Sequence, residues 1–192
     1  MMRFIIAGIT FAMAATLGWW TFNLYRSQNN AIAFGAPFAL IDNSGQPITE
    51  KAFQGHPSMV FFGFTHCPEV CPTTLSEIDT LLKQMGDEGK DIRAYFVTVD
   101  PERDTQEAMN NYVTNVSNRI TGITGEPAKI WQMAKDFKIF YRKVPTDDGD
   151  YTMDHTASVL LLNSKGDFFG TIAYEENPET ALAKLRRLAK EG

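Results

Sequence analysis

The chain has 192 residues, 44% of them hydrophobic and 21% charged, a composition typical of one folded globular domain and not of a disordered chain. Residues 1–26 contain two arginines and no acidic residue, so the formal net charge of −5 divides into +2 there and −7 over the rest. An acidic domain without a cluster of Lys and Arg argues against nucleic acid as a partner.

The first expected element is a membrane-spanning helix. Residues 4–22, FIIAGITFAMAATLGWWTF, contain no charge, and a helix of this length spans about 28 Å, close to the hydrocarbon thickness of a bilayer. Trp19, Trp20 and Tyr25 lie at its far end, where interfacial aromatic residues are common. A cleaved signal peptide is the alternative, because residues 31–33 (Ala-Ile-Ala) resemble a cleavage site, but they lie well beyond the apolar run.

These features predict a chain in three parts: a single N-terminal membrane anchor over residues 1–26, a short polar linker over 27–36 and one domain over 37–192. An N-terminal anchor that also serves as the export signal leaves the following domain outside the cytoplasm. The expected location is therefore the bacterial inner membrane, crossed once, with the soluble domain facing the periplasm.

Strands and helices alternate through the first half of this domain, and a hairpin and a helix end it. The pattern predicts a hairpin within 38–48, strands at 58–64, 92–99 and 139–141, helices at 72–85, 105–116, 126–137 and 178–190, and a second hairpin within 158–173. Asp104 or Thr105 is the expected cap of the second of these helices. Short β-α-β units with a cysteine pair at the first strand–helix junction indicate an α/β, thioredoxin-like fold.

The chain has only two cysteines, Cys67 and Cys71, in the motif HCPEVCP. Because a proline disfavours the α conformation in the residue before it, Pro72 predicts that Cys71 is the last loop residue or the N-cap of the helix. Cys67 then lies in the loop ahead of it, and both sulfurs can face one opening. The helix N-terminus lowers thiol pKa values there and favours the thiolate, which is the form that binds metal.

Two thiolates are soft ligands, and with one imidazole they suit Cu(I), with zinc as the alternative. His66 adjoins Cys67, but neighbouring side chains on extended backbone point apart, and His56 has no evident role. His155 is the preferred third ligand, because it comes just before an expected strand, in the loop that faces the cysteine motif of a thioredoxin-like fold.

The facing loop also lacks a proline. Thioredoxin-type oxidoreductases carry a cis-proline there, whereas this chain has no proline between Pro145 and Pro178. The loop therefore favours metal binding over general disulfide exchange.

Three stretches of the chain together resemble the Sco/SenC family of copper-binding proteins for cytochrome c oxidase assembly. They are FFGFTHCPEVCPTTL (61–75), VTVDPERDT (97–105) and DYTMDHTASVLLL (150–162). The resemblance covers residues 34–190 or so and implies a thioredoxin fold with an inserted hairpin, an N-terminal membrane anchor, and copper ligands matching Cys67, Cys71 and His155. Asp154 is either a supporting group for the matching histidine or a loop hydrogen-bonding residue.

The resemblance implies a metallochaperone that carries copper, as Cu(I), Cu(II) or both, to the dinuclear copper site of cytochrome c oxidase subunit II. The alternative is a thiol-disulfide reductase, in which Cys67 and Cys71 form a redox disulfide and maintain the cysteines of that site. Another periplasmic copper chaperone or a thioredoxin-like reductant is a further expected partner. A peroxidase is a weak third candidate, since a peroxidatic cysteine is not expected in a Cys-x-x-x-Cys loop.

Overall fold

The computed structural model describes residues 16–21, 35–147 and 149–191. Residues 16–21 are helical, and within these described ranges no helix is both long and apolar enough to cross a membrane. Most of the expected anchor over residues 1–26 lies outside the described residues, as does the linker before residue 35.

Phe34–Gly192 forms one compact unit built around a seven-stranded sheet in the order β2-β1-β5-β4-β3-β8-β9. The three central strands β3, β4 and β5 are parallel, and the outer strands pair antiparallel. The bounds of the strands are β1 Ala39–Asp42, β2 Pro47–Thr49, β3 Ser58–Gly63, β4 Arg93–Thr98, β5 Ile120–Thr124, β8 Val159–Leu162 and β9 Phe168–Ile172.

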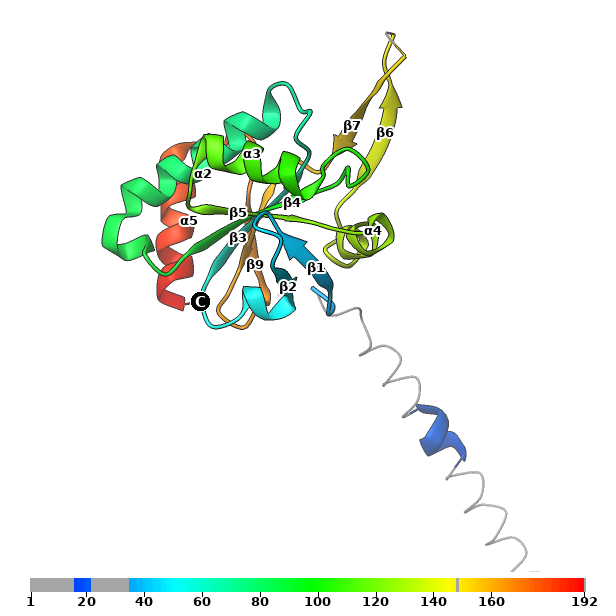
Figure 1. Ribbon diagram of the computed structural model, residues 1–192. Helices are drawn as coiled ribbons and strands as arrows, with labels where there is room; N and C mark the ends of the chain where they lie inside the picture. The colour runs from blue at the N-terminus through cyan, green and yellow to red at the C-terminus, as the bar shows by residue number, and fades with distance from the viewer. Residues whose placement is uncertain (1–15, 22–34, 148, 192) are drawn as a thin grey trace, which may run out of the picture. The chain divides into compact units, whose positions relative to one another are not determined.

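The helices cover both faces of this sheet. Helices α2, α3 and α5 lie on one side, where α2 contacts both of the others, and α4 lies on the opposite side (Figure 1). The helices are η1 Glu50–Phe53, α2 Val70–Met85, η2 Gly86–Gly89, α3 Gln106–Val116, α4 Pro127–Asp136 and α5 Pro178–Glu191. This α/β arrangement, with a cysteine at the junction of β3 and α2, is the thioredoxin-like fold that the sequence predicted.

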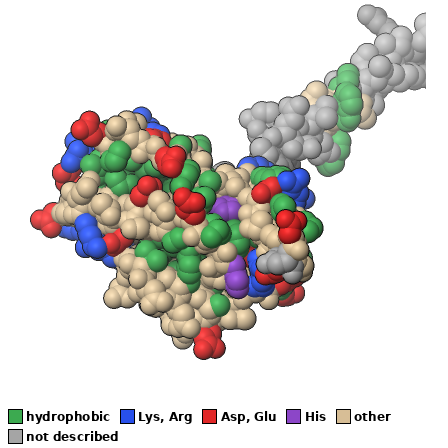
Figure 2. Space-filling view, turned by 90° about the horizontal axis from the view of Figure 1, so that it is seen from above, with side chains coloured by type: hydrophobic (Ala, Val, Ile, Leu, Met, Phe, Trp, Pro, Cys, Tyr) green, Lys and Arg blue, Asp and Glu red, His purple; other side chains and the backbone are tan. Residues whose placement is uncertain are grey.

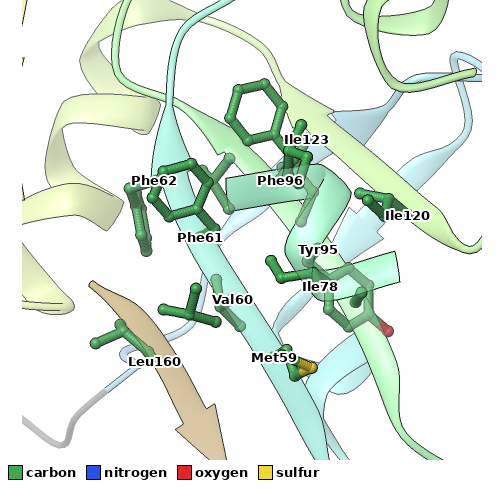
Figure 3. Close-up of a cluster of buried hydrophobic side chains, with 14 of the residues drawn as sticks. Met59, Val60, Phe61, Phe62, Ile78, Tyr95, Phe96, Ile120, Ile123 and Leu160 are labelled. Carbon is green, nitrogen blue, oxygen red and sulfur yellow. The ribbon is translucent and has the colours of Figure 1, made fainter. Parts of the chain in front are cut away.

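The core explains why β3 is a continuous apolar run. A central strand covered by helices on both faces needs apolar side chains in both directions, and Met59 to Phe62 are all fully buried. Phe61 stacks on Phe96 of β4, with ring centroids 6.0 Å apart, while Phe62 packs against Phe137 at the end of α4. Figure 3 shows this packing around β3 and β4.

A second hairpin stands apart from the main sheet. Strands β6 (Tyr141–Pro145) and β7 (Tyr151–His155) pair only with each other among the described strands, and they project from one end of the domain (Figure 1). The prediction that His155 lies in the loop before the strand at 158 was wrong, because His155 is the last residue of β7 and the loop begins at the next residue. The two segments are half-exposed and polar, so neither had the apolar pattern of a core strand.

One central strand was not predicted from the sequence. Residues Ile120–Thr124 (ITGIT) form β5, which joins the N-terminal hairpin to β4. Two threonines and a glycine make this stretch look like a connection. Gly122 leaves room for its neighbours, because an added Cβ would lie 3.1 Å from Asn43 and 3.2 Å from Met109.

The start of α3 provides a test of helix capping. Thr105 is the N-cap, and its hydroxyl accepts a hydrogen bond from the Ala108 N–H at 3.2 Å. We expect Thr105→Ala to lower the free energy of unfolding by about 1 kcal/mol, because it leaves an amide at the helix N-terminus unpaired. Urea unfolding measures this change.

Thr114→Ala is the matched control, since the Thr114 hydroxyl only bonds back to the Asn110 carbonyl within the exposed face of α3. Its effect should stay within about 0.5 kcal/mol of zero. Equal losses in the two variants would contradict the capping role.

Candidate metal centre

The loop between β3 and α2 carries Cys67, and α2 itself carries Cys71. The prediction that Cys71 ends the loop or caps the helix was wrong: α2 begins at Val70, so Cys71 is its second residue and Pro72 its third. Amides in the first turn have no partner within the helix, so a proline there removes no helical hydrogen bond. The first bond of the helix runs from the Thr73 N–H to the Glu69 carbonyl at 3.1 Å.

Three candidate ligand atoms meet at this junction. The sulfurs of Cys67 and Cys71 and one ring nitrogen of His155 all lie within 4.8 Å of one another. The Cys71 sulfur is 3.5 Å from His155 Nε2, although 84 residues separate them in the chain. The structure thus brings together the three residues that the sequence singled out.

The orientation of the His155 ring is set by its surroundings. Its Nδ1 lies 3.0 Å from the Thr156 carbonyl oxygen, a group that can only accept, so Nδ1 carries the proton. In the neutral ring the lone pair is then on Nε2, the nitrogen that faces the cysteines. The rings of Phe61 and Phe64 meet the imidazole edge-on, with centroids 5.9 Å and 5.8 Å away. A fixed tautomer of this kind is typical of a metal-binding histidine.

The two thiols differ in environment and in acidity. Cys67 is half-buried and Cys71 is buried. The hydrogen bond from the Cys71 thiol, together with those from the N–H groups of Cys71 and Glu69, lowers the pKa of Cys67 to about 4. The same pairing with Cys67, together with burial, raises the pKa of Cys71. The metal-free reduced site therefore holds one thiolate at Cys67 and one thiol at Cys71 near neutral pH.

Gly63 allows the buried sulfur to reach its place. A Cβ added to this last residue of β3 would lie 2.8 Å from the Cys71 sulfur and 2.7 Å from the ring of Phe96. The sulfur therefore lies against bare backbone. Any larger residue at position 63 would move Cys71 or the aromatic core.

A buried carboxylate holds the loop that carries Cys67. Asp104 is fully buried and accepts hydrogen bonds from the Thr65 amide at 3.0 Å, from the Thr65 hydroxyl at 2.6 Å and from the Thr98 hydroxyl at 2.6 Å. Burial raises its pKa despite these three donors. Asp104 thus ties the cysteine loop to the end of β4, a role that the sequence reading missed when it weighed Asp104 only as a helix cap.

A second buried carboxylate attaches the hairpin that carries His155. Asp100 accepts from Arg103 Nε at 2.5 Å and from the Tyr151 hydroxyl at 2.9 Å. The Arg103 guanidinium lies 3.7 Å from the centroid of the Tyr151 ring and donates to the Tyr151 carbonyl oxygen at 3.0 Å. We call these three residues, Asp100, Arg103 and Tyr151, the hairpin clamp.

The clamp acts on the face of the hairpin that bears the ligand. Side chains alternate along a strand, so Tyr151, the buried Met153 and His155 share one face of β7. Asp154 lies on the other face and forms an exposed ion pair with Arg142 at 2.5 Å. Asp154 therefore does not support the His155 ring.

The other two histidines lie outside the cluster. His66 is half exposed, and its Nδ1 lies 3.1 Å from the Thr65 hydroxyl. His56 Nδ1 lies near Ser58 at the start of β3. Figure 2 shows two of the three histidine side chains on the face seen from above, with hydrophobic side chains between them.

The three donors fit one soft metal ion. Bonds of about 2.0–2.3 Å from a thiolate or imidazole to a metal place the ligands of a trigonal site about 3.5–4 Å apart. The observed separations need only small side-chain shifts to reach these values. Two sulfurs and one nitrogen favour Cu(I), and four-coordinate structural zinc lacks a fourth protein ligand in the described residues.

Comparisons with known proteins point to one family. The model of the SCO1/SenC family matches residues 26–190. The SCO2-like protein of Rickettsia prowazekii is 36% identical over 149 residues, which are 77% of this chain and 71% of that protein. The human mitochondrial SCO1 homolog is 36% identical over 137 residues, 70% of this chain but only 46% of that protein.

Solved structures with bound copper share the fold. ScoI of Bradyrhizobium japonicum with copper bound is 44% identical, with a TM-score of 0.75 over 81% of this chain and 99% of that one. Yeast Sco1 with copper bound is 27% identical, with a TM-score of 0.76 over 83% of this chain and 90% of that one.

The acidity of Cys67 leads to a pH prediction. Because its pKa is lowered to about 4, the thiolate persists as pH falls and is lost only near pH 4. We expect the rate of iodoacetamide alkylation at Cys67, followed by mass spectrometry on reduced metal-free protein, to change little between pH 8 and pH 6. An ordinary thiol with a pKa of about 8.5 loses roughly a hundredfold of its thiolate over the same range.

Cys71→Ala is the informative variant for this measurement, because it removes the thiol that donates to Cys67. Its alkylation rate should fall steeply below pH 8. A steep fall in the unmodified protein would contradict the assignment of the thiolate to Cys67.

The hairpin clamp leads to a prediction about local stability. Tyr151→Leu removes the hydroxyl that donates a hydrogen bond to Asp100 and the ring that lies against Arg103. The hairpin should therefore open more often. We expect amide hydrogen exchange over residues 151–156 to accelerate at least about tenfold, the effect of losing roughly 1.4 kcal/mol of local stability. Arg142→Gln, which breaks only the exposed ion pair on the other face, should leave exchange there nearly unchanged.

Proposed function

Because the chain belongs to the SCO1/SenC family, we propose that it binds one copper ion through Cys67, Cys71 and His155 and delivers it to the dinuclear copper site of cytochrome c oxidase subunit II. The observation that carries this proposal is the convergence of two sulfurs and one imidazole nitrogen at a single opening. Copper-bound relatives of the same fold support the choice of metal.

The proposed function places the chain at a membrane. We infer that residues 1–26 anchor the chain in the bacterial inner membrane with a single span, and that the domain faces the periplasm. The support is the uncharged run over residues 4–22. The domain would then meet the exposed part of a membrane-bound oxidase without leaving the bilayer surface. A second copper chaperone in the periplasm is the proposed partner that supplies the copper.

The acidity of the site suits loading with Cu(I). Cys67 offers a thiolate at neutral pH, and Cys71 gives up its proton when the metal binds. Loading therefore releases about one proton where two ordinary thiols would release about two. The neutral imidazole of His155 completes the site without adding charge, so the loaded centre carries one negative charge.

The second candidate function is thiol-disulfide reduction of the oxidase cysteines, with a thioredoxin-like reductant to restore the thiols. One observation favours it: a half-exposed, acidic Cys67 beside a buried Cys71 is the arrangement of an attacking and a resolving thiol. This reaction needs both cysteines and does not need His155.

His155→Ala separates the two functions. Without its third ligand the site should lose copper to a competing Cu(I) chelator at least about tenfold more readily, while the cysteine pair still forms and breaks a disulfide. If copper delivery is essential, cells with this variant should assemble almost as little oxidase as cells lacking both cysteines. Excess copper should restore part of it by mass action.

His66→Ala and His56→Ala are the matched controls, and both should retain copper and support assembly. Near-normal oxidase assembly in His155→Ala cells, with copper binding shown to be lost, would reject delivery and favour the reductase.

A further inference from the structure

The acidic domain has one region of opposite charge. Residues 127–145, which form α4 and β6, contain five cationic residues and a single acidic one, Asp136, although the domain as a whole carries −7. Three of the five form ion pairs with acidic residues outside the segment. Lys135 and Lys138 are exposed and have no carboxylate at ion-pair distance among the described residues.

Apolar side chains lie around Lys135, and Lys138 directly precedes two of them, Ile139 and Phe140, in the chain. Trp131, Ile139, Phe140 and Tyr141 line a hollow of about 680 Å³ together with Lys135. Phe140 is 59% exposed, and among the described residues from 35 onward only Phe168 is a comparably exposed large hydrophobic residue. We call this surface the α4 groove. An aromatic groove flanked by lysines is the composition of surfaces that rest at a lipid–water interface.

The described part of the domain begins next to the end of α4. Gly35 lies against Phe137, the residue that follows α4, with a Cβ position only 3.2 Å from its ring. The linker residues 27–34 can reach at most about 28 Å when fully extended. A domain of this size is roughly 40 Å across. If residues 1–26 span the membrane, the linker is therefore too short for the far side of the domain to face the bilayer.

We propose that the α4 groove rests on the membrane surface, with Trp131 and Phe140 at the level of the headgroups and Lys135 and Lys138 against anionic lipid phosphates. This inference rests on the membrane anchor of the proposed function. It also places the metal centre, because Tyr141 of the groove pairs directly with His155 across the β6–β7 hairpin. The copper ligand would stand at the edge of the lipid-facing surface, beside the domains of other membrane-bound proteins.

The experiment uses the fragment 35–192 and vesicles. This fragment contains the whole hydrophobic core. The match covers 99% of the solved ScoI chain, so that chain is almost entirely the same domain and the fragment is expected to fold on its own. Trp131 is its only tryptophan, since the other two are Trp19 and Trp20. We expect vesicles of phosphatidylcholine with phosphatidylglycerol to shift Trp131 emission to shorter wavelength and to carry the fragment upward in flotation. Vesicles of phosphatidylcholine alone should bind it more weakly, and added salt should reduce binding to the anionic vesicles.

Variants distinguish the groove from other exposed residues. Lys135→Glu should weaken binding at least about fivefold, because it replaces attraction to the anionic surface with repulsion. Phe140→Ser should weaken it by removing the exposed ring. Phe168→Ser, at an exposed phenylalanine on the edge strand β9, is the control and should bind normally. Absence of binding, or equal losses in the two phenylalanine variants, would overturn the proposal.

A protein partner is the opposing outcome. If Phe140→Ser leaves vesicle binding intact but slows copper transfer to purified oxidase, the groove docks a protein and the lipid assignment is wrong. The anchor is tested separately by the location of the full-length chain. Recovery of the full-length chain in a salt-washed membrane fraction supports the anchor. If the fragment binds vesicles but the full-length chain is found free of membranes, the anchor is rejected and the lipid-binding role of the α4 groove is kept.

Discussion

The buried carboxylate of Asp100 joins the hairpin that carries His155 to the loop after β4. It accepts hydrogen bonds from Arg103 and Tyr151, and the Arg103 guanidinium is held against the Tyr151 ring. Removing one partner of a buried ion pair typically costs about 3–5 kcal/mol, because the remaining charge has no compensation. Since the hairpin pairs with none of the described strands of the main sheet, this attachment outside the site helps to fix where the third metal ligand stands.

The two cysteines owe their different chemistry to position rather than to residue type. Cys67 lies in the loop ahead of α2 and receives hydrogen bonds from thiol and amide donors, whereas Cys71 is covered by the core and lies against Gly63. One sulfur is therefore ready to react or bind, and the other is protected until a metal or a disulfide partner arrives. The same pair can serve copper binding and thiol exchange, and His155 is the residue that separates these functions.

Sequence patterns predicted most of the regular elements, because local chemistry decides them. Gly86 ends α2 with a positive φ that suits glycine, and Thr105 caps α3 with its hydroxyl. The predictions failed where tertiary contacts outweigh local preference. Cys71 is a different case with a local reason: it is helical although a proline follows it, and that proline lies in the first turn, where amides need no helical partner. Residues 120–124 become a central strand because neighbouring strands complete their hydrogen bonds, although their own composition resembles a turn.

The sequence by itself determined the type of site: two cysteines at a strand–helix junction and a histidine in a separate motif are soft ligands wherever the chain places them. It also determined the fold class, because buried β-α-β units have a recognisable apolar pattern. Only the tertiary structure decided that Nε2 of His155 faces Cys71 at 3.5 Å, and that Asp100 and Asp104 hold the two segments in place. The reason is physical: hydrogen bonds between residues tens of positions apart depend on the packed sheet, and no local pattern encodes their distance or their direction.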